Sequence, residues 1–150
     1  MMRLASVIFW AGWVLMALVL AALSQGYPRD QYGNIAQAVV ATFSGADVGG
    51  QTASLPAAVG KTTYICGLNI GGLGATGAAT IQVTVSPLVG NQTMTFQYQM
   101  PSGNNSVAPV TSGSFSPCIP ANAPNTAINV SVGGAAGNTS TQVNVYGYQL

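Results

Sequence analysis

Residues 62–150 alternate apolar side chains with uncharged polar ones, and this stretch contains no Asp, Glu, Lys, Arg or His. The alternation is clearest at residues 92–100, whose apolar members are Met94, Phe96, Tyr98 and Met100. Successive side chains of a β-strand point to opposite faces, so a period of two predicts strands with one apolar and one polar face. We therefore expect a β-structured body whose outward faces carry no charge.

Similar runs recur along the chain, separated by clusters of Gly, Pro and Asn that favour turns. We expect strands at residues 35–43, 61–70, 79–86, 92–100, 107–110, 114–119, 126–132 and 140–150, and a loop at residues 47–60. The first of these runs could also form a short helix. Short strands at intervals of roughly 8–15 residues predict an all-β domain, either an antiparallel β-sandwich or a jelly roll of about seven or eight strands.

Two finer expectations concern individual strands. Within residues 61–70, the alternation places Tyr64, Cys66, Leu68 and Ile70 on one face. Pro109 and Pro117 interrupt two of the later runs. Because proline cannot donate a hydrogen bond to a neighbouring strand, we expect those two runs at the edges of sheets.

The N-terminal part of the chain contains an uncharged apolar segment at residues 4–23, preceded by Arg3. Its small-x-small end is typical of a signal peptide, with cleavage before Gln25. Its length of about twenty residues also suits a retained helix that enters a membrane or an assembly. We divide the chain into a signal peptide or apolar helix at residues 1–24, a linker at 25–34 and a β-sandwich domain at 35–150. In both cases we expect the domain to be extracytoplasmic.

Cys66 and Cys118 are the only cysteines in the chain. In an exported domain an even number of cysteines favours a disulfide, and the alternative is a pair of separate buried thiols. A disulfide here would join a mid-strand position to a proline-rich loop or edge strand, and would contribute about 4 kcal/mol in the chain-entropy model. The chain has no histidine that could form a thiolate, so we expect neither cysteine to be a nucleophile.

The composition also removes most groups that carry catalysis. The charged side chains are Arg3, Arg29, Asp30, Asp47 and Lys61, and the chain has no His or Glu. A serine hydrolase needs a base beside its hydroxyl, and a glycosidase needs two carboxyl groups that flank the bond. Metal sites need clusters of His, Cys or carboxylates. We therefore expect no enzymatic activity, no cofactor and no metal site, and two basic residues in the body are too few to predict nucleic-acid binding.

The last strand has apolar residues on both faces. Tyr146, Tyr148 and Leu150 lie opposite Val143 and Val145 in the alternation. Such a strand is either central in a sandwich or buried at a contact between subunits, so these three residues are candidate interface residues. A neutral surface has little charge repulsion to keep copies apart. We expect the partner to be the protein itself, in a homo-oligomer or larger assembly, with a membrane as a further candidate partner of residues 4–23.

Three phrases carry a resemblance to a known group of proteins: KTTYICGLNI at residues 61–70, PCIPANAPNTAINVSV at 117–132 and NVYGYQL at 144–150. They resemble small β-sandwich proteins that bacteriophages and prophages encode and that look like surface or decoration components of the virion. The resemblance covers residues 61–150. It implies a structural subunit present in many copies and supplies no site residues.

Three functions follow as hypotheses. The first is a non-catalytic structural protein of a virion or cell surface, which acts as a repeated, self-associating β-domain. The second is a pilin-like filament subunit that retains its N-terminal helix. The third is a secreted adhesin or carbohydrate-binding module, for which Tyr32, Tyr146 and Tyr148 are the candidate aromatic contacts.

Overall fold

The computed structural model describes residues 28–29, 33, 35–45, 50–73, 77–103, 107, 110–134 and 140–150. The chain divides into two compact units, Met1–Ala36 and Gln37–Leu150. The apolar segment at residues 4–23, predicted as a signal peptide or helix, lies outside the described residues. Among the residues that are described, no helix combines the length and the apolar character needed to cross a membrane.

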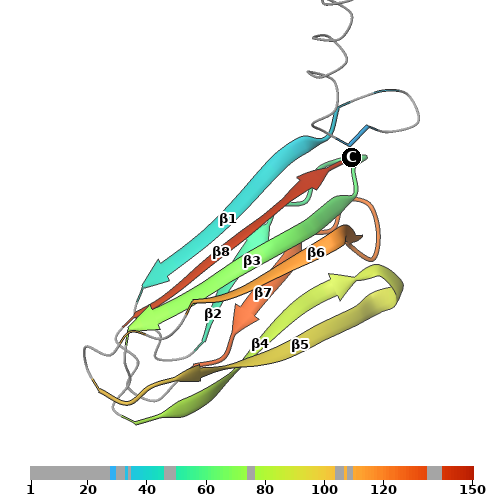
Figure 1. Ribbon diagram of the computed structural model, residues 1–150. Coiled ribbons are helices and arrows are strands. Elements are labelled where there is room, and N and C mark those ends of the chain that lie inside the picture. The colour runs from blue at the N-terminus through green and yellow to red at the C-terminus, as the bar shows by residue number, and fades with distance from the viewer. Residues whose placement is uncertain are drawn as a thin grey trace, which may run out of the picture. The chain divides into compact units, whose positions relative to one another are not determined.

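The unit Gln37–Leu150 is a sandwich of two antiparallel sheets with four strands each (Figure 1). The strand order is β1-β8-β3-β6 in the first sheet and β2-β7-β4-β5 in the second. The strands are β1 (Gln37–Gly45), β2 (Gln51–Leu55), β3 (Thr63–Leu73), β4 (Ala79–Leu88), β5 (Gln92–Met100), β6 (Thr111–Pro120), β7 (Ile128–Val132) and β8 (Ser140–Gln149). A short 3-10 turn, η1 (Val89–Asn91), joins β4 to β5. The predicted all-β, antiparallel sandwich is thus confirmed.

The strands pair in a nested order. β1 pairs with β8, β2 with β7, β3 with β6 and β4 with β5, all antiparallel. Two further pairings, β3 with β8 and β4 with β7, complete the sheets. This nesting is the strand order of a jelly roll, in which a folded antiparallel ribbon places its successive strand pairs alternately in one sheet and in the other. As a result, the first and last strands of the unit lie side by side in the first sheet.

The core lies between the two sheets and is almost entirely aliphatic. Its fully buried side chains are Leu55, Ile65, Leu68, Ile70, Val83, Val85, Ile128, Val130, Val143 and Val145, with Ile81, Met100 and Val132 nearly so. They occupy alternate positions of their strands because only one face of each sheet meets the other sheet. β-branched residues suit this role, since they pack well on a pleated surface.

The loop predicted at residues 47–60 is wrong in part, because it contains β2. This strand has five residues, and its inward side chains are Ala53 and Leu55. One small and one large apolar residue in so short a run make a weak alternation. Two residues of the strand predicted at residues 107–110 are described. Val107 forms an isolated bridge with Leu73, and Val110 lies outside the strands.

The predicted common face of Tyr64, Leu68 and Ile70 is also wrong. The register of β3 shifts between Ile65 and Gly67 against both of its neighbours. A β-bulge of this kind adds one residue and reverses the alternation beyond it. Leu68 and Ile70 therefore point into the core together with Ile65, whereas Tyr64 points outward.

Candidate interaction surface

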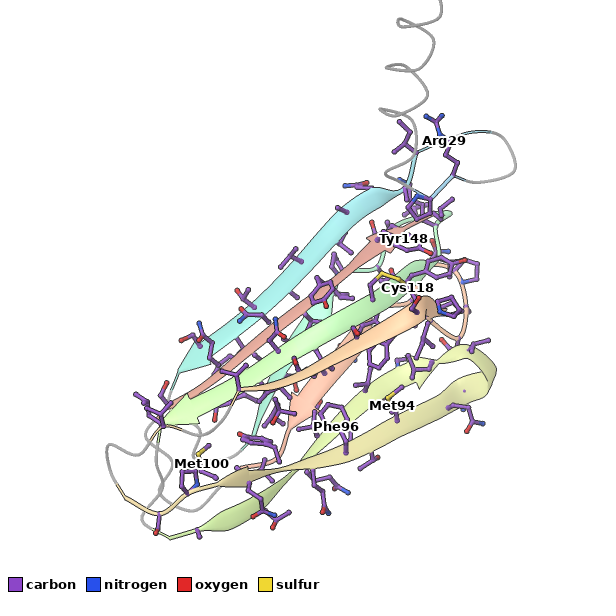
Figure 2. The ribbon with its side chains drawn as sticks, viewed as in Figure 1. Arg29, Met94, Phe96, Met100, Cys118 and Tyr148 are labelled. Atoms are coloured by element: carbon purple, nitrogen blue, oxygen red, sulfur yellow. A yellow bond between two sulfur atoms is a disulfide. The ribbon has the colours of Figure 1, made fainter. Side chains whose placement is uncertain are left out.

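Cys66 of β3 and Cys118 of β6 form the predicted disulfide, with their Cα atoms 4.3 Å apart (Figure 2). β6 is an edge strand of the first sheet, as its Pro117 predicted. The disulfide therefore ties an interrupted edge strand to the bulge of its only partner strand among the described residues. A disulfide forms and persists in oxidising compartments, which agrees with an extracytoplasmic location.

The outer face of the first sheet carries three tyrosines. Tyr146 and Tyr148 point outward from β8 because Val143 and Val145 point inward, as the alternation predicted. Tyr64 faces Tyr148 across the β3–β8 ladder, and their rings are stacked, with centroids 4.7 Å apart and an interplanar angle of 16°. Stacked aromatic pairs of this kind contribute about 0.5–1.5 kcal/mol beyond the area they bury.

Val40 of β1 lies opposite Tyr146 in the β1–β8 register and extends this surface. Its side chain is 67% exposed, and that of Tyr146 is 39% exposed. We call these four residues, Tyr64, Tyr146, Tyr148 and Val40, the tyrosine patch. A cluster of apolar and aromatic side chains that is exposed on a sheet face is typical of a contact surface.

Two glycines make room for the tyrosine patch. Gly67 lies opposite Tyr146 in the β3–β8 register, and a Cβ atom at this position would overlap the Tyr146 hydroxyl. Gly147 lies between Tyr146 and Tyr148, and a Cβ atom there would overlap the carbonyl oxygen of Tyr64. An aromatic ring laid across a cross-strand glycine covers backbone that would otherwise be bare. Tyr146 therefore lies along the sheet over β3.

The phenol of Tyr148 is a weaker acid than that of an ordinary tyrosine. Burial of the side chain raises the pKa of Tyr148 above the usual 10.0, and the neighbouring Tyr64 raises the pKa further. Both effects disfavour the phenolate, the first by removing water and the second by charge repulsion. At physiological pH this part of the tyrosine patch thus offers an aromatic ring and a neutral hydroxyl.

Leu150, the third predicted interface residue, follows the end of β8. Its backbone nitrogen donates to the carbonyl oxygen of Thr62 at 3.1 Å, and its carbonyl oxygen accepts from the nitrogen of Thr62 at 2.7 Å. Its backbone thus extends the ladder between β3 and β8. Tyr64, by contrast, belongs to the tyrosine patch and was missed. The pair Cys66-Gly67 inside an apolar run is the signal that could have indicated the bulge.

The outer face of the second sheet is an array of hydroxyl and amide side chains. Its members are Thr52, Ser54, Thr80, Gln82, Thr84, Thr93, Thr95, Gln97, Gln99, Asn129 and Ser131. Hydrogen bonds join neighbours across the strands, including Thr52 Oγ1 with Ser131 Oγ at 2.9 Å and Ser54 Oγ to Asn129 Oδ1 at 2.7 Å. We call this surface the amide–hydroxyl face.

A shallow hollow of about 330 Å³ opens on the amide–hydroxyl face, and Thr52, Gln82, Thr84 and Ser131 contribute to its lining. A second hollow, of about 250 Å³, lies beside the Gly71-Gly72 end of β3. Neither has an ionisable side chain in its lining. Neutral hydroxyls and amides form hydrogen bonds but do not ionise near neutral pH. These hollows can therefore hold a polar group without acting as an acid or a base.

Charge is almost absent from the described part of this unit. Lys61 is the one charged side chain that the structure describes in Gln37–Leu150, and its Nζ donates to Gln37 Oε1 at 3.3 Å. The described residues also contain no group of three His, Cys, Asp or Glu that could hold a metal ion. What the surface offers is contact area with neutral hydrogen-bonding groups.

Comparison with known proteins gives no family assignment. No protein-family model matches the chain, and no curated protein shows a significant sequence match. The functional interpretation therefore depends on the surfaces described above.

Proposed function

We propose that this protein is a non-catalytic structural subunit that packs with copies of itself at the surface of a virion or a cell. The observation that carries the proposal is the neutrality of both outer faces, which present the tyrosine patch on one sheet and the amide–hydroxyl face on the other. Copies that carry so little charge approach one another without electrostatic repulsion. Contact between these faces also buries no unpaired ion, and the burial of such an ion would cost free energy.

The tyrosine patch suits a role as a contact between subunits. Aromatic residues are enriched in the cores of interfaces and charged residues are depleted there. Tyr64 and Tyr148 already hold each other in a stacked arrangement, so they lose little conformational freedom when a partner covers them. The exposed side chains of Val40 and Tyr146 supply the apolar area that association would bury.

The jelly-roll strand order agrees with a structural role. Jelly rolls are used as building blocks of viral capsids and also as lectin domains. The resemblance of residues 61–150 to phage-encoded β-sandwich proteins favours the first use. The disulfide and the apolar segment at residues 4–23 favour a position outside the cytoplasm.

Sedimentation velocity of the full-length chain across low to high micromolar concentrations tests this function. A mild detergent should be present throughout, because it shields the apolar segment at residues 4–23 from association of its own. We expect species larger than a monomer that grow with concentration, and regular particles or sheets by electron microscopy. A single monomeric species across the whole range would contradict the proposal.

A further inference from the structure

We propose that two copies join edge to edge through β5, in antiparallel orientation, so that their second sheets merge into one continuous sheet. This inference rests on the proposed function and deepens it by naming one contact surface and its partner, a second copy of this chain. It concerns the edge of the second sheet and not the tyrosine patch on the first.

β5 is the least protected edge of the sandwich. Its nine residues, QTMTFQYQM, include no proline, glycine or charge, and among the described residues it pairs with β4 alone. Natural edge strands are usually short or carry proline, bulges or charges that prevent pairing with another chain. β5 is neither short nor interrupted by proline or charge, and its one register shift against β4 lies at the Gln92 end. The stretch from Met94 to Met100 therefore presents its backbone hydrogen-bonding groups as a template for a further strand.

The other three edges differ from β5. β2 has only five residues. β6 contains two prolines and is held to β3 by the disulfide. β1 lies close to β2, where the two sheets meet at one side of the sandwich, whereas β5 and β6 approach each other much less closely on the opposite side. β5 is therefore the edge on the more open side that contains no proline.

Apolar side chains remain partly exposed on that open side. Met94 and Phe96 of β5 and Phe115 of β6 pack against the core, yet all three are only half-buried. Figure 2 shows Met94 and Phe96 extending from β5 toward the first sheet. Farther along the same strand, Met100 is buried. A strand added beside β5 would cover the exposed parts of Met94 and Phe96 and would gain stability from the apolar area removed from water.

The pattern of β5 is complementary to itself. In an antiparallel pair centred on Phe96, this residue lies opposite Phe96 of the second copy, and Thr95 lies opposite Gln97. Because opposed positions then share the same face, apolar side chains meet apolar ones and hydroxyls meet amides from Thr93 to Gln99. Such a contact is closed by two-fold symmetry. It leaves the tyrosine patch available for contacts with other copies.

Two outward residues allow a test that leaves the core unchanged. Thr95 and Gln97 are both exposed on the outer face of β5. In the double variant Thr95→Lys/Gln97→Lys, like charges meet twice across the two-fold axis, and we expect the dimer to weaken by about tenfold or more at low salt. In Thr95→Lys/Gln97→Glu, opposite charges meet at the same two places, and we expect the dimer to persist.

The matched control is Ser112→Lys/Ser114→Lys, which puts the same two charges on exposed positions of β6, in the other sheet and outside both named surfaces. We expect this control to dimerise like the unaltered chain. All variants are full-length and are compared in the same detergent, so any contribution of residues 4–23 is common to them. Sedimentation equilibrium gives the dissociation constants, and circular dichroism confirms that each variant is folded.

Hydrogen exchange of the unaltered chain supplies a second measurement. We expect the backbone amides of β5 to exchange more slowly as concentration rises, while those of β2 do not change. If the lysine–lysine variant assembles as well as the unaltered chain, or if exchange in β5 does not depend on concentration, the edge proposal is overturned and self-association still stands. If the unaltered chain is monomeric throughout, both proposals fall.

Discussion

At the scale of single residues, the fit between Gly67 and Tyr146 shows how one missing side chain shapes a surface. The glycine lets the tyrosine ring lie over β3, and the bulge beside it turns Tyr64 outward to stack on Tyr148. A strand glycine normally weakens a sheet, because it has no side chain to pack. Here the ring of Tyr146 supplies the covering that Gly67 lacks.

Replacing Gly67 by alanine should therefore destabilise the domain. The added Cβ atom would meet the Tyr146 hydroxyl and also the carbonyl oxygen of Gly113, which belongs to the backbone and cannot move aside freely. We expect a loss of about 1–3 kcal/mol in the free energy of unfolding, measured with urea. Gly77→Ala is the control, because a Cβ atom added there would meet no atom within 4 Å, so it should change stability by less than about 0.5 kcal/mol. Equal stabilities of the two variants would contradict this packing.

The raised pKa of Tyr148 predicts a loss of stability in alkaline solution. A folded-state pKa above the unfolded value means that the folded chain holds this proton more tightly than the unfolded chain does. Its contribution to stability is then fully present below pH 10.0 and decreases as the pH rises toward the folded-state pKa. Urea unfolding at about pH 8 and about pH 11 should show a smaller alkaline loss for Tyr148→Phe than for the unaltered chain. A loss of the same size in both would refute the assignment.

At the scale of elements, the strength of the alternation decides which strands the sequence predicts. β5 was predicted with the bounds that it has, because four large apolar residues alternate with four polar ones between clear turns. β2 was missed, since its inward side chains are one alanine and one leucine. The faces of β3 were assigned wrongly beyond Ile65, because one extra residue in a strand reverses the pattern without changing the composition.

The disulfide is the element-scale feature with the largest expected effect on stability. It closes a loop between positions 52 residues apart and fixes β6 to β3. The variant Cys66→Ser/Cys118→Ser should lose about 4 kcal/mol in the free energy of unfolding, because its unfolded chain is no longer restrained.

Urea unfolding with and without a reducing agent measures this effect. The reducing agent should destabilise the unaltered chain and leave the serine variant unchanged. If the two proteins are equally stable without reductant, the disulfide does not restrain the unfolded chain as described.

At the scale of the whole molecule, the sequence indicated the sandwich and its neutral faces but not the nested pairing of the strands. Alternation shows which residues of a strand share a face, whereas the choice of neighbouring strands depends on packing between segments that are far apart in the sequence. The same limit applies to the candidate surface. Tyr146 and Tyr148 could be predicted from β8 alone, but Tyr64 and Val40 join them only through the pairing of three strands.

Removing the tyrosine patch should separate the two kinds of contact that we propose. In the variant Tyr146→Ala/Tyr148→Ala, we expect association beyond the β5 dimer to weaken by about tenfold or more, because aromatic residues often dominate interface energies. Dimers should persist, since β5 lies in the other sheet. Sedimentation velocity distinguishes the two species. Unchanged large assemblies would show that the tyrosine patch is not a contact between subunits.

The most direct test of the central claim, that a neutral body acts through contact with copies of itself, is the salt dependence of its association. The association constant of the full-length chain should be measured from about 0.05 to about 1 M NaCl, a range over which screening removes most surface electrostatic attraction. We predict a constant that stays within about twofold or increases, because apolar and neutral polar contacts are not screened by salt. An association constant that falls steeply with salt, or the absence of association at any salt concentration, would contradict the claim.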